Sequence, residues 1–319
     1  MFKYPCLPPS ACVEGLSFVI PAYNEAGAIA QTVARCQAVL NTIEGILGEV
    51  IVVDDCSVDG TGEAAAKAGA RVLRHVQNAG YGRSLKDGIL AASHDTIIIL
   101  DGDGTYPVEM TPAMLEEYKK GFHLVVGRRQ GQHYLQSLWK MTLRHILQRL
   151  TEFVAGQSIP DVNSGLRIFS RRELLPYFNH LCETFSFTTS QTLAYLMTGK
   201  FIRYVPIDYK MRVGSSKVRH CRDSMRTLQY IIQAIIYYNP IKGFMVLSGL
   251  MLAMAATCFL GAAVTGLTVA YFIGIAAVLV AMLTFSLGFV CELLRQILLD
   301  RAMDPEIAKT ARCKNLIVD

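Results

Sequence analysis

Charged residues are absent from one long part of this 319-residue sequence. Between Gly243 and Cys291 there is no Asp, Glu, Lys, Arg or His, although 18% of the whole chain is charged. Because a bilayer-spanning helix needs about 20 apolar residues, the segment predicts two transmembrane helices near 243–264 and 269–290, with a turn at 265–268. A hairpin buried in a soluble core is the alternative, but such core helices rarely run this long without a charge.

The N-terminal segment lacks the features of a secretory signal. Residues 1–14 include three prolines and no apolar run, so we expect no signal peptide. The charge-free segment has basic flanks: Lys217, Arg219, Arg222, Arg226 and Lys242 precede it, and Arg295 and Arg301 follow it. Since cytoplasmic loops are enriched in Lys and Arg, we expect both ends of a two-span protein of the inner or plasma membrane to be cytoplasmic.

The cysteines also lack a pattern. There are nine, an odd number, with no C-x-x-C pair, so we expect reduced packing residues rather than a disulfide framework or a zinc site. The formal net charge of +5 is modest. It fits an anionic leaflet and anionic ligands, and we expect no nucleic-acid partner.

The first part of the sequence contains an alternation of strand and helix signals. Apolar runs predict strands at 16–20, 49–53, 71–74, 96–100 and 124–126, and helical patterns occur at 25–40, 61–68, 84–93 and 110–120. Strands this apolar are covered on both faces, so we predict an α/β fold with a mainly parallel sheet flanked by helices. In such sheets the ligand lies at the carboxyl ends of the strands.

Polar side chains follow three of these strands. The first is followed by P-A-Y-N-E at 21–25, the second by Asp54 and Asp55, and the fourth by Asp101 and Asp103. Several carboxylates at one edge repel each other, and a bound divalent cation relieves this repulsion. The D-G-D triplet offers the hard oxygen ligands that Mg²⁺ or Mn²⁺ prefers, but a D-x-D alone also occurs in ordinary turns.

Four motifs in order give the triplet its context. They are V-I-P-A-Y-N-E at 19–25, V-V-D-D-C-S-V-D-G-T at 52–61, N-A-G-Y-G-R-S-L-K-D-G at 78–88 and L-D-G-D-G-T-Y-P at 100–107. Together they resemble the family 2 inverting glycosyltransferases of GT-A fold. The resemblance implies that Asp101 and Asp103 are the catalytic pair, bound to the metal and the donor diphosphate, with Asp103 the more direct ligand. The residues it implies for binding a UDP- or GDP-sugar donor are Pro21, Tyr23, Glu25, Asp54, Asp55, Gly80 and Arg83.

Motifs in the second half of the chain narrow the resemblance to one group within this family. R-R at 128–129, D-V-N-S-G-L-R-I-F at 161–169 and V-P-I-D-Y-K-M-R-V-G-S-S-K at 205–217 look like the polyprenyl-phosphate glycosyltransferases. That group includes dolichol-phosphate mannose synthases and bacterial undecaprenyl-phosphate sugar transferases, and it allows a homo-oligomer. The resemblance implies a polyprenyl phosphate acceptor, undecaprenyl or dolichyl. The candidate ligands of its phosphate are Arg128, Arg144, Arg212, Ser215 and Lys217.

The chemistry of a phosphate acceptor differs from that of a hydroxyl acceptor. A sugar hydroxyl must lose a proton to attack, which requires a general base, and Asp161 is the nearest candidate. A lipid monophosphate has a second pKa near ~6, so it is already ionised and needs cations instead. A hydroxyl-accepting transferase, a processive polysaccharide synthase and a non-enzymatic membrane scaffold stay open as alternatives. A nicotinamide dehydrogenase would need a glycine fingerprint that is missing.

These patterns together predict the organisation of the chain. A basic amphipathic stretch occurs at 136–155, and a second amphipathic stretch, at 224–238, has the character of a membrane-interface helix. The predicted parts are an N-terminal extension (1–14), a cytoplasmic GT-A catalytic domain (15–215), juxtamembrane interfacial helices (216–242), a transmembrane hairpin (243–291) and a cytoplasmic tail (292–319).

Overall fold

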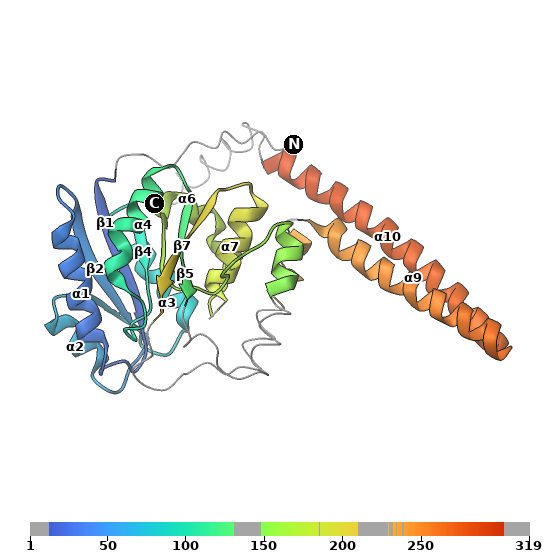
Figure 1. The fold of residues 1–319 in the computed structure, drawn as a ribbon, viewed down its shortest axis with the longest axis horizontal. Coiled ribbons are helices and arrows are strands. Elements are labelled where there is room, and N and C mark those ends of the chain that lie inside the picture. The colour runs from blue at the N-terminus through green and yellow to red at the C-terminus, as the bar shows by residue number, and fades with distance from the viewer. Residues whose placement is uncertain are drawn as a thin grey trace, which may run out of the picture. The chain divides into compact units, whose positions relative to one another are not determined.

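The computed structural model separates the chain into two compact units, Met1–Ile231 and Ile232–Asp319, each described here by itself (Figure 1). The structure describes residues 13–130, 148–184, 186–209, 229, 232–233, 235–237 and 239–302. Most of both predicted amphipathic stretches therefore lies outside the described residues, except that 148–155 is helical.

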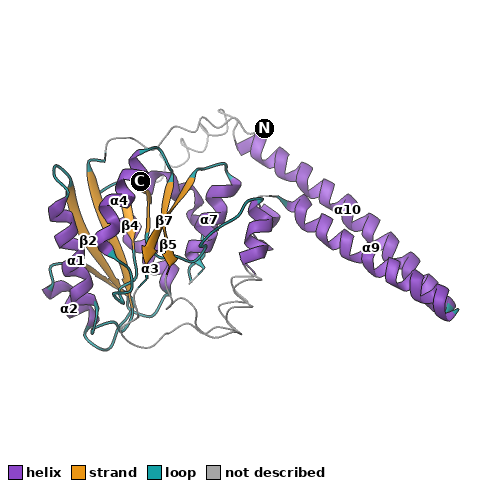
Figure 2. Ribbon diagram, viewed as in Figure 1, coloured by secondary structure: helices purple, strands orange, loops and turns teal. Residues whose placement is uncertain are grey.

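The first unit alternates strands with helices, as the sequence predicts (Figure 2). Its strands are β1 (Gly15–Ala22), β2 (Leu47–Asp54), β3 (Arg71–Arg74), β4 (Thr96–Ile99), β5 (Leu124–Gln130), β6 (Arg167–Ser170) and β7 (Ile202–Asp208). Its helices are α1 (Ile29–Thr42), α2 (Thr61–Lys67), α3 (Tyr81–Ala91), α4 (Thr111–Lys119), α6 (Arg171–Leu174) and α7 (Phe187–Met197), with 3₁₀ turns η1 (Val108–Met110) and η3 (Leu175–His180).

The strands form one sheet in the order β3-β2-β1-β4-β6-β5-β7. Only β6 runs antiparallel to its neighbours β4 and β5 among the described strands, which confirms the prediction of a mainly parallel sheet. The chain enters β6 from the loop 161–166, which bonds to Gly127 in the middle of β5, directly after the β5 residues that pair with β6. Because the loop lies on the carboxyl side of this pairing, β6 runs antiparallel to β5.

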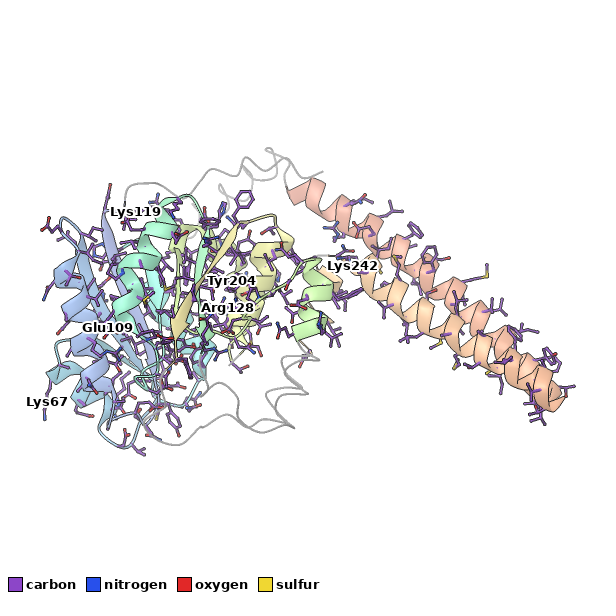
Figure 3. The ribbon with its side chains drawn as sticks, in the orientation of Figure 1. Lys67, Glu109, Lys119, Arg128, Tyr204 and Lys242 are labelled. Atoms are coloured by element: carbon purple, nitrogen blue, oxygen red, sulfur yellow. The ribbon has the colours of Figure 1, made fainter. Side chains whose placement is uncertain are left out.

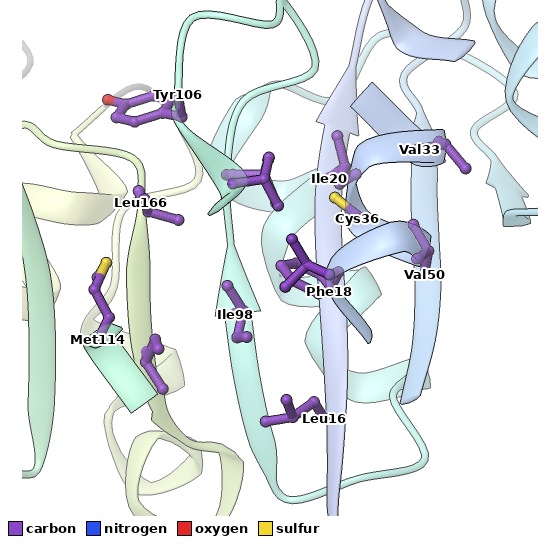
Figure 4. Packing of buried hydrophobic residues seen from close by; sticks show 14 of the residues in the cluster. Leu16, Phe18, Ile20, Val33, Cys36, Val50, Ile98, Tyr106, Met114 and Leu166 are labelled. Carbon is purple, nitrogen blue, oxygen red and sulfur yellow. The ribbon is translucent and has the colours of Figure 1, made fainter. Parts of the chain in front are cut away.

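Alternate residues of the strands serve two separate cores. Leu16, Phe18 and Ile20 of β1 pack with residues of α1 and α4 on one face, and Figure 4 shows part of this cluster. Val19 points the other way and packs with residues of α3 and α7. This period of two is the geometry of a strand, and two buried faces explain why the strands are apolar throughout.

Two helices begin at residues that differ from the prediction. Helix α3 starts at Tyr81 rather than near residue 84, because Gly80 adopts φ +100° and its carbonyl accepts the N–H of Ser84 at 3.0 Å. Helix α1 starts at Ile29 rather than near residue 25. The residues before it form a turn, since the Glu25 carbonyl accepts the N–H of both Ala28 and Ile29 at 3.0 Å.

The second unit is a pair of long apolar helices, α9 (Pro240–Thr265) and α10 (Thr268–Ala302). Both are long and apolar enough to cross a membrane, by length and composition, which confirms the two helices predicted from the charge-free segment. Gly266 turns the chain between them at φ +72°. The helices pack closely, since the Ser248 hydroxyl donates to the Ala281 carbonyl at 3.0 Å.

Helix α10 continues beyond the charge-free segment. Glu292 and Arg295 lie one turn apart within it and form an ion pair. Such i,i+3 pairs support a helix, so part of the predicted tail is helical.

Candidate active site

The carboxyl ends of β1, β2 and β3 meet at one edge of the sheet. In the parallel register Ala22 lies beside Asp54, and Asp54 lies beside Arg74. Strand β4 pairs with β1 on its other side and is followed directly by Leu100 and Asp101. The sheet therefore brings the three motif segments predicted for donor and metal binding to the same edge.

Asp101 is half-buried. The Tyr81 hydroxyl donates to its Oδ1 at 2.9 Å. Gly165 lies on another side: a Cβ there would be 2.9 Å from the same oxygen. Helix α3 and the loop before β6 therefore both define where this carboxylate sits.

Asp103 is held by its own turn. Its side chain is buried, with 4% exposed. Its Oδ1 accepts the N–H of Thr105 at 3.1 Å and the Thr105 hydroxyl at 2.6 Å. Gly104, at φ +74°, lets the chain turn so tightly. The carboxylate is thus oriented before any ligand is bound.

Asp54 and Asp55 have different surroundings although they are adjacent. Asp54 is fully buried; its Oδ1 accepts the N–H of Ser57 at 2.9 Å, and Arg74 Nε lies 3.5 Å from its Oδ2. Asp55 accepts the N–H of Ala79 at 2.7 Å and of Gly80 at 2.9 Å. Asp55 and Gly80, both predicted donor residues, are therefore in direct contact.

His75 extends the Asp55 contact toward helix α3. Its Nδ1 lies 2.8 Å from Asp55 Oδ1, and its Nε2 lies 3.2 Å from Asp87 Oδ2. Arg83 Nε donates to the same Asp87 oxygen at 2.7 Å. Arg83, a predicted donor residue, thus pairs with Asp87 on its own helix.

The loop that carries Tyr23, Asn24 and Glu25 is tied to the loop after β2. Its backbone N–H groups donate to side chains of that loop: Asn24 to Ser57 Oγ at 2.9 Å, Glu25 to Thr61 Oγ1 at 2.8 Å and Ala26 to Asp59 Oδ2 at 3.1 Å. Pro21 is buried at the end of β1, and the Tyr23 side chain is partly exposed.

Asp59 is one of the side chains that join these two loops. Burial would raise its pKa, but hydrogen bonds from the Thr61 hydroxyl and from backbone N–H groups outweigh burial and hold the pKa of Asp59 below its usual value. Sequence reasoning did not single out Asp59 or Thr61. The signal that could have found them is the D-G-T at the end of the second motif, a helix start with polar side chains near its N-terminus.

Asp161 is engaged by Arg129. The guanidinium donates through Nε and an Nη to the two carboxylate oxygens, both at 2.8 Å, and the backbone N–H of Arg129 adds a bond of 3.2 Å. Burial would raise the pKa of Asp161, but these bonds and the charge of Arg129 lower it below its ordinary value. A carboxylate held in this way is a weak base near neutral pH.

Arg167 is a further residue that sequence reasoning missed. It is fully buried and donates to the carbonyls of Ser164 and Val162 at 2.7 Å each, and to Thr192 Oγ1 at 2.8 Å. Burial lowers the pKa of Arg167 to about 10, so it is charged at neutral pH. Arg167 therefore fixes the loop that approaches Asp101.

The predicted acceptor ligands are only partly within the described residues. Arg128 is exposed on β5, near Tyr204 of the paired strand β7 (Figure 3). The other four predicted ligands lie outside the described residues: Arg144, Arg212, Ser215 and Lys217.

Known proteins are similar to this chain in sequence. The family described as Glycosyl transferase family 2 matches residues 17–175. A dolichyl-phosphate hexose transferase of Haloferax volcanii is 31% identical over 207 residues, which is 64% of this chain and 87% of that protein. An undecaprenyl-phosphate 4-deoxy-4-formamido-L-arabinose transferase of Salmonella paratyphi A is 28% identical over 51% of this chain, which spans only 50% of that relative's length.

Solved structures show the same fold. The glucosyl-3-phosphoglycerate synthase of Mycobacterium tuberculosis, crystallised with Mg²⁺ and UDP, superposes with a TM-score of 0.57 at 20% identity, over 69% of this chain and 79% of that one. The predicted GT-A fold is thereby confirmed. The family predicted from the four motifs is confirmed as well: the chain belongs to glycosyltransferase family 2.

Proposed function

We propose that this enzyme transfers a hexose from a UDP- or GDP-sugar to a polyprenyl phosphate at the cytoplasmic face of a membrane. A divalent cation, Mg²⁺ or Mn²⁺, assists the reaction and is held by Asp101 and Asp103. The anomeric configuration of the sugar is inverted in a single displacement. Two relatives, named as dolichyl-phosphate and undecaprenyl-phosphate sugar transferases, support this class of acceptor.

The observation that carries the choice of acceptor is the pairing of Asp161 with Arg129. A hydroxyl acceptor requires a general base, and Asp161 is the residue expected in that role. Its carboxylate is bound on both oxygens and its pKa is lowered, which opposes proton abstraction at neutral pH. A phosphate acceptor makes no such demand, because it is already ionised.

Cations would hold the lipid phosphate beside the donor diphosphate. Arg128 is exposed at the carboxyl end of β5 and has no ion pair within the described residues. A guanidinium suits this role because its planar fork matches phosphate oxygens. We include Arg144, Arg212, Ser215 and Lys217 in the same clamp, as the motif resemblance implies.

The donor set at Asp101 and Asp103 fits a hard cation. Both side chains offer carboxylate oxygens, the ligands that Mg²⁺ and Mn²⁺ prefer. No group of three or more His, Cys, Asp and Glu side chains that could hold a metal ion by itself occurs among the described residues, which suits a cation that completes its shell with donor phosphates and water. When bound, such a cation neutralises charge on the departing nucleoside diphosphate.

The rest of the reaction follows from what the chain holds in place. An oxygen of the acceptor phosphate attacks the anomeric carbon, a new carbon–oxygen bond forms, and the bond to the diphosphate breaks. The braced loops at 23–26 and 79–81 orient the nucleotide, with Pro21, Tyr23, Glu25, Asp54, Asp55, Gly80 and Arg83 as the proposed donor residues. Orientation of both reactants accounts for much of the rate gain in such displacements.

The apolar hairpin would keep the enzyme where its lipid acceptor is. Exposed apolar side chains run along both α9 and α10, and the basic residues that flank them favour cytoplasmic ends. A membrane-held acceptor and a membrane-held enzyme then meet on one surface.

The test uses membranes that contain the full-length chain. They are incubated with a panel of labelled nucleotide sugars and Mg²⁺ or Mn²⁺, with polyprenyl phosphate or the unphosphorylated polyprenol as acceptor, and lipids are extracted. Label in an acid-labile lipid that depends on the phosphate supports the proposal. Label in a polymer, or equal transfer to the alcohol, contradicts it.

A further inference from the structure

The Asp101 carboxylate is held in position by contacts of its own. Its Oδ1 receives the hydroxyl of Tyr81, the first residue of α3, at 2.9 Å. The phenol is thus a hydrogen-bond donor to this carboxylate.

The start of helix α3 is fastened where it stands. The N–H groups of Ala79 and Gly80 both donate to the Asp55 carboxylate, at 2.7 and 2.9 Å. Gly82 is so close to the chain at Cys182 that a Cβ would lie 2.3 Å from its carbonyl oxygen. Because the chain is held on both sides of Tyr81, the backbone from which its side chain extends is fixed in position.

The Asp101 carboxylate also lies against the backbone of the loop before β6. A Cβ on Gly165 would lie 2.9 Å from Oδ1 and 3.2 Å from both Cγ and Oδ2 of Asp101. The Gly165 N–H donates to the Tyr106 hydroxyl at 2.7 Å, and Ser164 Oγ donates to the Gly127 carbonyl at 2.5 Å. The backbone at Gly165 is therefore held in place, so a side chain added there would displace the Asp101 carboxylate.

We propose that Tyr81 and Gly165 are positioning residues that set the orientation of the Asp101 carboxylate and thereby the affinity for the divalent cation. Tyr81 anchors one oxygen, and Gly165 leaves the space in which the carboxylate lies. The inference rests on the proposed function, because it takes Asp101 as a metal ligand. Groups that orient a ligand typically change metal affinity by about 10- to 100-fold when they are removed.

Three variants and one control separate the possibilities. Tyr81→Phe removes only the hydroxyl, Gly165→Ala adds the obstructing methyl group, and Asp103→Asn alters a proposed ligand. Tyr177→Phe is the matched control, since its hydroxyl also makes one bond, to Thr198 Oγ1 at 3.0 Å near the end of α7. Thermal melting of each purified full-length variant shows whether it is folded.

The readout is Mn²⁺ affinity, measured by electron paramagnetic resonance in the presence of UDP, together with UDP binding in EDTA. We expect Tyr81→Phe to weaken Mn²⁺ binding about tenfold and Gly165→Ala to weaken it more, with UDP binding in EDTA and the Tyr177→Phe control unchanged. In Tyr81→Phe the apparent KM for Mn²⁺ should rise, and kcat should recover at saturating metal.

The outcomes distinguish the inference from the proposed function. Parental Mn²⁺ affinity in folded Tyr81→Phe, with loss of affinity in Asp103→Asn, overturns the positioning role and leaves the metal site standing. Parental affinity in Asp103→Asn as well removes the metal site itself. If Gly165→Ala does not fold, Tyr81→Phe alone decides.

Discussion

The two compact units differ in where they place their apolar side chains. In the first, Ile97, Ile98 and Ile99 of β4 are all fully buried. In the second, side chains such as Phe272 and Leu283 are largely exposed within the segment from Gly243 to Cys291, which has no charged residue. Apolar area removed from water stabilises a fold by about 25 cal/mol per Å². Helices whose apolar side chains were exposed to water would lack this stabilisation. Exposed apolar helices of this length are those expected of a membrane anchor.

The units also differ in what holds them together. Loops of the first unit are fastened by charged and polar side chains, as Arg129 fastens Asp161 and Asp59 fastens Ala26. The hairpin relies on small residues at the contact, since Ala255, Ala262 and Ala281 are buried although most of its larger apolar side chains are exposed. Polar geometry should therefore control chemistry in the first unit, and apolar surface should control location in the second.

The largest expected effect separates chemistry from location. Asp103→Asn should lower transfer about 1,000-fold, because it weakens the proposed cation site that stabilises the leaving group. The protein should remain in the membrane fraction, since the hairpin is unchanged. Radiolabel transfer and carbonate extraction measure the two properties; parental turnover in Mg²⁺ and Mn²⁺ would contradict the assignment.

A matched pair of leucines tests the difference in solvent. Leu283 in α10 is 66% exposed and Leu47 at the start of β2 is 72% exposed. Leu283→Arg should oppose membrane insertion by about 2.5–3.5 kcal/mol, whereas Leu47→Arg should change stability by less than about 0.5 kcal/mol. Insertion assays and melting curves provide the measurements. Equal tolerance of both changes would argue against a lipid environment for α10.

A smaller effect is expected from the buried arginine. Arg167→Met should lower the free energy of unfolding of the first unit by about 2 kcal/mol, because the Val162 and Ser164 carbonyls lose a buried donor. The control is Arg172→Met, whose exposed pair with Asp95 contributes at most about 1 kcal/mol. Denaturant titration compares them, and equal stabilities would show that the loop does not depend on Arg167.

The smallest effect concerns pH. Because the folded-state pKa of Asp161 is lowered, its contribution to stability is present above its ordinary pKa of about 4 and is lost as the pH falls through the folded-state value. In Asp161→Asn the melting temperature should depend less on pH between about 5 and 3. Melting curves across this range provide the test; identical slopes would mean that the Arg129 pair does not stabilise the fold.

Much of the fold was predictable because its signals are local. Strand β3 was predicted at its observed bounds, and the apolar runs of β1 and β4 showed that both faces of the sheet are covered. The start of α3 was not predictable from periodicity, since it depends on Asp55, distant in sequence, accepting the N–H groups of Ala79 and Gly80. The roles assigned to the donor and acceptor residues stay predictions.

The sequence by itself determined the family, the mainly parallel sheet and the apolar hairpin, because motif order, strand periodicity and absence of charge are all written along the chain. Only the tertiary structure decided which groups meet. It showed that Arg129 pairs with Asp161 and that Arg167 lies fully buried beneath the loop before β6. It also showed that Tyr81 and Gly165 both contact the Asp101 carboxylate. Those contacts join residues far apart in sequence, and their distances arise only when the strands and loops pack.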